Sequence, residues 1–171
     1  MAGMSQAEHK ARAPMSVRCF IVTVSDTRTE ATDTSGRAIA DLLTAAGHVV
    51  AGRAIVKDES DLVRGALERR LASADVQAII TTGGTGITAR DNTYEVVSGL
   101  LQKRLDGFGE LFRMLSFEQI GPAAMMSRAC AGITAGHHVL VSLPGSEAAV
   151  RLAMERLLIP ELGHLVEQAG R

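Results

Sequence analysis

The sequence is poor in aromatic residues. It has no tryptophan, and aromatic residues make up 3% of its 171 positions. Its formal net charge is −1 at pH 7 and its sequence pI is near 6.5. Proteins that bind nucleic acids need a basic surface and commonly use aromatic side chains as stacking platforms. The composition therefore argues against a nucleic acid as a partner.

Cysteine is also scarce. Cys19 and Cys130 are the two in the chain; both have apolar neighbours and neither has metal-ligand spacing. Two reduced thiols in the core explain this pattern better than a disulfide. No segment approaches the ~20 apolar residues of a membrane span, and residues 1–15 lack the apolar stretch of a signal peptide. We therefore expect a cytoplasmic protein that does not associate with membranes.

The remaining composition is that of an ordinary globular protein. Of the 171 residues, 46% are hydrophobic and 22% are charged, which suffices for one full core and is short for two. Residues 1–15 are polar with scattered charges. We expect a flexible N-terminal tail over residues 1–15 and a single domain over residues 16–171.

Segments of strand and helix character alternate along the chain. Continuous apolar, β-branched runs predict buried strands, and apolar residues at helical spacing predict helices. The predicted order is a strand at 17–24, a helix at 34–46, a strand at 49–56, a helix at 62–71 and a strand at 76–81. This alternation predicts a three-layer α/β/α fold with a mostly parallel central sheet.

The second half of the chain is harder to interpret. Residues 106–110 resemble a turn that opens a helix carrying Leu111, Phe112 and Leu115, but residues 105–133 as a whole are less readable. A late strand is predicted at 139–142. Ser146 is placed to cap a final helix that is interrupted or restarted at Pro160.

The most informative segment is Thr82-Gly83-Gly84-Thr85-Gly86, which follows a predicted strand and precedes Asp91. Glycines leave backbone N–H groups uncovered and permit positive φ, so an anion can lie against the main chain. The segment is therefore a candidate phosphate site. A plain strand-to-helix turn is the alternative, and the glycines alone do not separate the two.

Two common phosphate motifs do not account for this segment. The chain has no Gly-Lys-[Ser/Thr], so a Walker loop is excluded. Gly84-x-Gly86-x-x-Ala89 is half of a dinucleotide fingerprint, but it follows the third predicted strand rather than the first. A dinucleotide is therefore a poor candidate ligand.

An ordered series of motifs resembles one family of proteins. The series is Val22-Thr23-Val24-Ser25-Asp26, Thr81 to Gly86 with Arg90-Asp91, Gly107-Phe108-Gly109-Glu110 with Ser116, Ser127-Arg128, and Leu143-Pro144-Gly145-Ser146. It is similar to the molybdenum cofactor biosynthesis proteins of the molybdopterin adenylyltransferase type, closest to the protein B branch. The resemblance covers roughly residues 17–165. It implies an α/β domain that binds molybdopterin and, in active members, joins its terminal phosphate to AMP from ATP with Mg²⁺.

The resemblance also implies roles for particular residues. Backbone N–H groups of Gly83 to Gly86, with the hydroxyls of Thr82 and Thr85, would hold the pterin phosphate. Asp58 and Asp91 match the two catalytic carboxylates of active members, which would bind Mg²⁺ through substrate phosphates. Asp is also common as a turn residue and as a helix N-cap, and these are the alternatives for Asp91 and Asp58, respectively.

Other positions are assigned to substrate binding by the same resemblance: Ser25, Asp26, Glu110, Ser116, Pro144, Gly145 and Ser146. An Asx turn explains Asp26 equally well, and Glu110 and Ser146 suit a first-turn acid and an N-cap. Arg128 is a candidate for contact with a phosphate or with a neighbouring subunit. His137 and His138 suit loop histidines better than metal ligands, because no third ligand lies at metal spacing.

The chain departs from active adenylyltransferases after the loop aspartate. Those enzymes usually carry a Thr-Pro pair, whereas this chain has Asp91-Asn92-Thr93-Tyr94. A non-catalytic molybdopterin-binding or assembly protein is therefore the second hypothesis. The resemblance implies a homotrimer or hexamer, consistent with the apolar residues of 111–126, and the downstream molybdenum-insertion protein is a candidate partner.

Overall fold

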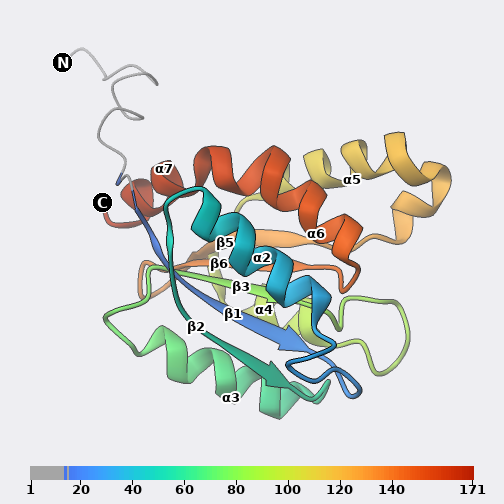
Figure 1. Cartoon of the computed structure of the whole chain (residues 1–171), viewed down its shortest axis with the longest axis horizontal. Helices are drawn as coiled ribbons and strands as arrows, with labels where there is room; N and C mark the ends of the chain where they lie inside the picture. The colour runs from blue at the N-terminus through green and yellow to red at the C-terminus, as the bar shows by residue number, and fades with distance from the viewer. Residues whose placement is uncertain (1–13, 15) are drawn as a thin grey trace.

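Six β-strands form one sheet through the middle of the protein (Figure 1), in a computed structural model that describes residue 14 and residues 16–171. The order across the sheet is β2-β1-β3-β6-β5-β4. β2, β1, β3 and β6 are parallel, whereas β5 is antiparallel to β6 and β4 is antiparallel to β5. The strands are β1 (Arg18–Val24), β2 (Val49–Val56), β3 (Ala78–Thr82), β4 (Leu101–Arg104), β5 (Cys130–Thr134) and β6 (Val139–Leu143).

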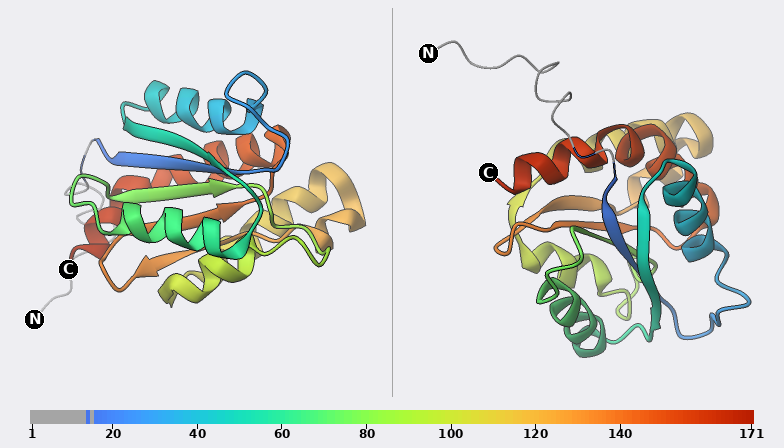
Figure 2. Two further views of the ribbon diagram at one scale, coloured as in Figure 1. Left: turned by 90° about the horizontal axis from the view of Figure 1, so that it is seen from below. Right: turned by 60° about the vertical axis from the view of Figure 1, so that its left-hand side comes forward.

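Helices cover both faces of this sheet, as Figure 2 shows from two further directions. One face carries α2 (Thr34–Ala45), α5 (Asp106–Ile120), α6 (Glu147–Ala153) and α7 (Ile159–Ala169). The other carries α3 (Ser60–Leu71) and α4 (Thr93–Leu100). The predicted three-layer α/β/α fold with a mostly parallel sheet is confirmed.

The central strands β1, β3 and β6 are buried on both faces, which explains why their sequences are almost continuously apolar. Successive side chains of a strand point to opposite faces. Ile21 and Ile80 accordingly lie in the core under α2 and α6, whereas Val22 and Ile79 lie in the core under α3 and α4. This packing holds the carboxyl ends of the strands at one edge of the sheet.

Most predicted elements agree with the structure to within two residues. The predicted strand at 76–81 is β3, which begins later and includes Thr82. Gly47, with φ of +84°, follows α2 as the predicted left-handed residue. Ser146 is the N-cap of α6, and its Oγ accepts a hydrogen bond from the Ala149 N–H at 3.3 Å.

Two strands were not predicted: β5 lies largely in the region 105–133 that was hard to interpret, and β4 lies just before that region. β4 lies at the edge of the sheet and is mostly exposed, so it has polar residues and no apolar run. β5 contains Gly132, which weakens a strand signal. A Cβ at Gly132 would lie 2.3 Å from the Lys103 carbonyl oxygen, so glycine permits the close approach of β4.

The final helix differs in detail from the prediction. A π-helical turn, η2 (Met154–Leu158), joins α6 to α7, so the chain stays helical from Glu147 to Ala169. Pro160 lies in the first turn of α7 and does not interrupt the run. A 3₁₀ segment, η1 (Gly121–Met126), follows α5.

Two further expectations concern the chain as a whole. The predicted tail over residues 1–15 falls outside the described residues, apart from residue 14. Within residues 14 and 16–171, no helix is long and apolar enough to cross a membrane.

Candidate functional site

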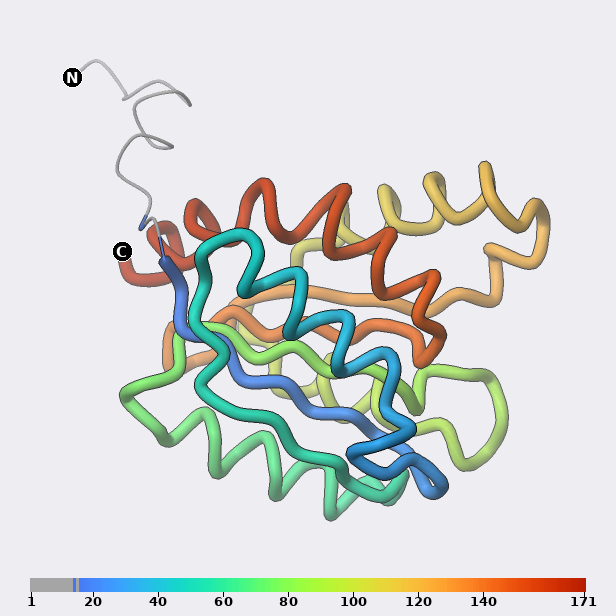
Figure 3. Tube along the Cα trace, viewed as in Figure 1, coloured from blue at the N-terminus to red at the C-terminus, as the bar shows by residue number. Residues whose placement is uncertain are grey.

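Loops that follow parallel strands gather at one edge of the sheet, towards the right in Figure 3. Backbone hydrogen bonds tie them together there: the Ser25 N–H donates to the Val56 carbonyl at 2.8 Å, and the Gly83 N–H donates to the Leu143 carbonyl at 3.1 Å. The Thr82 hydroxyl donates to the Pro144 carbonyl at 2.8 Å. Ligands of open α/β sheets bind at this edge.

The glycine loop after β3 has the backbone that its sequence predicts. Gly83 has φ of +99° and Gly84 has φ of +65°, values that side chains disfavour. A Cβ at Gly83 would lie 2.2 Å from the Val24 carbonyl oxygen, and one at Gly145 would lie 3.3 Å from the Gly83 Cα. The glycines therefore let three segments from different strands meet without intervening side chains.

Two cavities lie against this loop and share Gly83, Gly84 and Gly145 in their walls. The larger, about 320 Å³, will be called the outer cavity; it is lined further by Thr85, Gly86, Asp91, Met126, Ser127, Arg128 and Pro144. The smaller, about 200 Å³, will be called the inner cavity; it is lined further by Thr23, Val24, Ser25, Arg28, Ser35 and Thr82. The site therefore has two compartments with a common glycine wall.

Asp91 lies at the rim of the outer cavity and is held by its own loop. Its Oδ2 accepts hydrogen bonds from the Thr88 N–H, at 3.0 Å, and from the Thr88 hydroxyl. These bonds, the hydroxyl first, lower the pKa of Asp91 below the ordinary 3.8. Asp91 is thus the turn residue of the alternative interpretation and also an ionised carboxylate that faces the cavity.

Asp58 approaches the same loop from the end of β2. A Cβ at Gly84 would lie 2.9 Å from Asp58 Oδ1 and 3.0 Å from its Oδ2. Burial, then the charges of Asp91 and Asp26, raise the pKa of Asp58 above 3.8. The N-cap residue of α3 is Glu59, so the alternative that Asp58 caps this helix is wrong.

Two buried oxygen atoms beside Gly84 have no hydrogen-bond partner: Asp58 Oδ1 and Thr93 Oγ1. Together with the mutual repulsion of the carboxylates, they fit a site that a hard cation such as Mg²⁺ would stabilise. Among the described residues, no three His, Cys, Asp or Glu side chains are grouped to hold a metal ion. A cation here would therefore need further oxygen ligands from a bound phosphate.

Ser25 and Asp26, at the end of β1, have different tasks. The Ser25 hydroxyl oxygen accepts hydrogen bonds from the N–H groups of Thr27 and Arg28 and so shapes its own turn. Asp26 accepts from the Asp58 N–H at 3.2 Å and pairs with Arg90 at 2.7 Å. Asp26 therefore links three loops, a role that the proposed Asx turn does not describe.

Comparison with known proteins shows the family to which this chain belongs. A family model with the description "Probable molybdopterin binding domain" matches residues 20–164. The chain belongs to this molybdopterin-binding family. It is 53% identical over 169 residues to molybdenum cofactor biosynthesis protein B of Bacillus anthracis, covering 98% of this chain and 99% of the relative.

Solved structures of relatives agree with the fold. A crystal structure of molybdenum cofactor biosynthesis protein B aligns with a TM-score of 0.89 at 52% identity, covering 94% of this chain and 99% of the other. The tungsten cofactor synthesizing protein MoaB from Pyrococcus furiosus aligns with a TM-score of 0.83 at 37% identity, covering 93% and 100% of the two chains. The resemblance stated from the motifs is confirmed.

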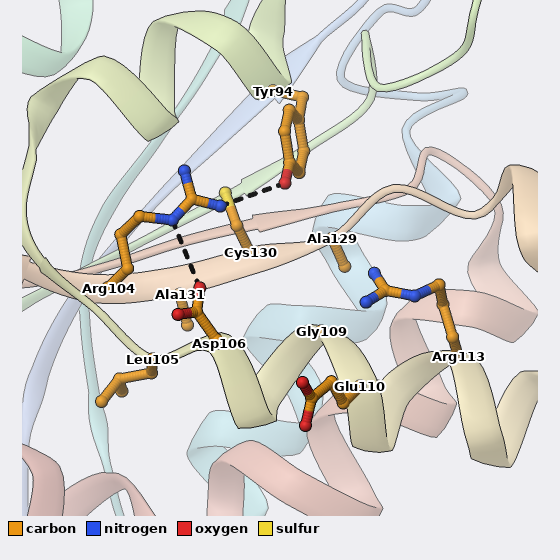
Figure 4. Close-up of a pocket in the computed structure, with 10 residues that line it drawn as sticks. All are labelled: Tyr94, Arg104, Leu105, Asp106, Gly109, Glu110, Arg113, Ala129, Cys130 and Ala131. Atoms are coloured by element: carbon orange, nitrogen blue, oxygen red, sulfur yellow. Dashed lines mark hydrogen bonds and ion pairs between the residues drawn. The ribbon is translucent and has the colours of Figure 1, made fainter.

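Not every residue that the family resemblance implies reaches the two cavities. Glu110 lines a separate cavity of about 240 Å³ between α4, β5 and α5, together with Tyr94, Arg104 and Arg113 (Figure 4). Ser116 is buried within α5, and its hydroxyl donates to the Phe112 carbonyl at 2.7 Å. Within this chain, neither Glu110 nor Ser116 contributes to the walls around the glycine loop.

His137, His138 and the two cysteines lie outside this site. His137 and His138 are in the turn between β5 and β6, and His137 Nδ1 is 2.8 Å from the Ala169 carbonyl oxygen. Cys19 and Cys130 are free and buried, as predicted, and burial raises their pKa values to about 12 and about 11. Both thiols are therefore protonated and unreactive at neutral pH.

Sequence reasoning did not assign several residues that the structure places at the site, among them Thr23, Arg28 and Ser35 in the wall of the inner cavity and Thr93 beside Gly84. Thr93 was noted only within the segment Asp91-Asn92-Thr93-Tyr94. Ser35 lies in α2, and its hydroxyl donates to the Gly145 carbonyl at 2.6 Å, a contact across 110 residues. Such a contact has no local sequence signal, because it depends on the packing of α2 against β1 and α6.

Proposed function

We propose that this protein acts in molybdenum cofactor biosynthesis, where it binds molybdopterin and adenylylates its terminal phosphate with Mg-ATP, releasing pyrophosphate. The observation that carries the proposal is the pair of cavities that share Gly83, Gly84 and Gly145. A transfer between two phosphorylated substrates requires that both phosphates meet at one place. A common wall of exposed backbone provides such a place.

The reaction would proceed by attack of a terminal phosphate oxygen of molybdopterin on the α-phosphorus of ATP. A new P–O–P linkage forms, the bond to the bridging oxygen breaks, and its electrons leave with pyrophosphate. Magnesium, supplied with ATP, would neutralise charge on the phosphate oxygens. Asp58 and Asp91 would hold that ion, while the N–H groups of the glycine loop orient the attacking phosphate.

The relatives support a role in the pathway, and the position of Asp58 supports catalysis. The relatives are molybdenum cofactor biosynthesis proteins by name. Asp58, with a buried oxygen that lacks a partner beside the glycine loop, favours an active site over a passive carrier. The second candidate function, a non-catalytic molybdopterin-binding or assembly protein, is favoured by Tyr94 where active members usually have proline.

One incubation distinguishes these functions. Purified protein is mixed with molybdopterin, ATP and Mg²⁺, and adenylylated pterin and pyrophosphate are quantified. We expect both products in equal amounts. Pterin binding without product would instead support the carrier function, and no pterin binding would refute both.

We further propose that the protein is a homotrimer or hexamer in the cytoplasm. Six large apolar residues of α5 and η1 are exposed: Leu111 46%, Met114 54%, Phe117 59%, Ile120 54%, Met125 79% and Met126 51%. Exposed apolar residues in such numbers on one segment commonly mark an interface. The downstream molybdenum-insertion protein remains a second candidate partner for this surface.

A further inference from the structure

Arg128 follows η1 and extends into the glycine loop, where it lines the outer cavity. It was a candidate for contact with a phosphate or with another subunit. The structure shows a different environment, because its guanidinium is engaged with five oxygen atoms of its own chain.

Three of these oxygens are main-chain carbonyls of the loop. Arg128 Nε donates to the Thr85 carbonyl at 2.9 Å, and Nη2 donates to the carbonyls of Gly86, at 2.6 Å, and Asp91, at 3.3 Å. The guanidinium therefore joins the two ends of the segment that carries Asp91. Lysine could not reproduce this arrangement, because it lacks the planar fork of donors.

Two neighbours on α4 hold the guanidinium in place. Glu95 forms an ion pair with Nη1, and its Oε2 is 3.3 Å from Nη2. The Tyr94 ring lies beneath the guanidinium, 4.9 Å from centroid to Cζ. The Arg128 side chain is only 26% exposed, whereas its partner Glu95 is 55% exposed.

Holding the carbonyls also directs the N–H groups of the loop. A trans peptide unit points its C=O and N–H in opposite directions. Because Arg128 draws the Thr85 and Gly86 carbonyls towards itself, the N–H groups of Gly86 and Ile87 point away from it. An isolated loop with several glycines would sample many other orientations.

We propose that Arg128 is a positioning residue: it fixes the peptide units of Thr85 and Gly86 and the place of Asp91 in the free protein, with Tyr94 and Glu95 as its supports. The effect on turnover rests on the proposed adenylylation. The effect on the loop does not, so the two are tested separately.

The first measurement is hydrogen–deuterium exchange of the ligand-free, full-length protein. In Arg128→Gln, amides of residues 83–92 should exchange at least about tenfold faster, while those of β1 and β3 remain unchanged. Arg64→Gln, which removes an exposed ion pair with Glu68 on α3, is the matched control and should leave the loop unchanged. Should Arg128→Gln fail to fold, Arg128→Lys keeps the charge and aliphatic stem and should accelerate exchange in the same segment.

Tyr94 provides a second matched pair. Tyr94→Phe keeps the ring beneath Arg128 and loses only the hydroxyl that accepts from Arg104 at 3.3 Å. Tyr94→Ala removes the ring. Loop exchange should rise in Tyr94→Ala and stay at the wild-type rate in Tyr94→Phe.

The second measurement is steady-state adenylylation with molybdopterin and Mg-ATP. Arg128→Gln should lower kcat about tenfold or more and leave the KM for ATP within about threefold, because positioning acts on the reacting geometry. If loop exchange is faster in Arg128→Gln but the wild-type protein forms no adenylylated product, the role of Arg128 is supported and the proposed function is refuted. Unchanged loop exchange in Arg128→Gln overturns the inference. If the variant also binds ATP more weakly, Arg128 contacts a phosphate directly instead.

Discussion

Gly84→Ala is the most direct test of the geometry of the glycine loop. Gly84 has φ of +65°, and a Cβ there would lie 2.2 Å from Thr93 Oγ1. The left-handed backbone costs a non-glycine residue roughly 1 kcal/mol. Thr93 is fully buried, so relieving the overlap would cost a further ~1–3 kcal/mol, as overpacking does in protein cores. We expect a total loss of about 2–4 kcal/mol in the free energy of unfolding.

Two other glycines separate these contributions. Gly47 has φ of +84° with no atom within 4 Å of an added Cβ, so Gly47→Ala should lose only the backbone cost of about 1 kcal/mol. Gly107 lies in α5, in open space and without a positive φ, so Gly107→Ala should be neutral or stabilise by up to ~1 kcal/mol. Urea unfolding of the three variants and the wild type measures all of these differences.

Gly84→Ala should also affect function. The added carbon would point towards Thr93 and Asp58, so any relaxation of the loop would displace the Asp58 carboxylate. Adenylylation should therefore fall in Gly84→Ala and stay at the wild-type rate in Gly47→Ala. Equal losses of stability in Gly84→Ala and Gly47→Ala would refute the reasoning, because they would show that no overlap with Thr93 exists.

Three further predictions follow from the site and the surface. Asp91→Asn should lower turnover on the order of 10²-fold with little change in pterin affinity, because the amide keeps an acceptor for Thr88 and loses only the charge. If steady-state kinetics give a rate within about threefold of wild type, Asp91 is a turn residue alone. The folded-state pKa of Asp58 is raised above 3.8, so its ionisation disfavours the folded state as pH rises through that range. Asp58→Asn should therefore increase the urea midpoint at pH 7 and abolish adenylylation. The gain in stability should disappear below pH 3.8, where the Asp58 carboxyl of the wild type is protonated in both the folded and the unfolded state. An unchanged midpoint at pH 7 would contradict the pKa argument. Light scattering with size exclusion should show a trimer or hexamer that dissociates in Phe117→Glu, and a wild-type monomer at micromolar concentration would refute the oligomer.

The fold could be predicted because its central strands carry a strong local signal. β1, β3 and β6 are buried on both faces, so hydrophobic residues fill them almost without interruption. The amphipathic α2 shows the period of a helix packed on one side. β4 and β5 were not predicted, because neither strand has a continuous apolar run: β4 is an exposed edge strand and β5 contains a glycine.

The candidate site could be predicted only in part. The glycine loop is a local feature, since its positive φ values require glycine whatever lies around it. Glu110 and Ser116 illustrate the opposite case. The motif that contains them belongs to the family pattern, yet α5 places Glu110 in another cavity and Ser116 inside the helix.

The sequence by itself determined the alternation of strands and helices, the glycine loop and the family, because each depends on residues that are close together or in a recognisable order. Only the tertiary structure decided which side chains meet around the glycine loop. Asp26, Asp58 and Arg90 come from three different loops and are brought together because parallel strands end at one edge of the sheet. Arg128 binds the carbonyls of a loop about 40 residues away, and only folding brings the two together.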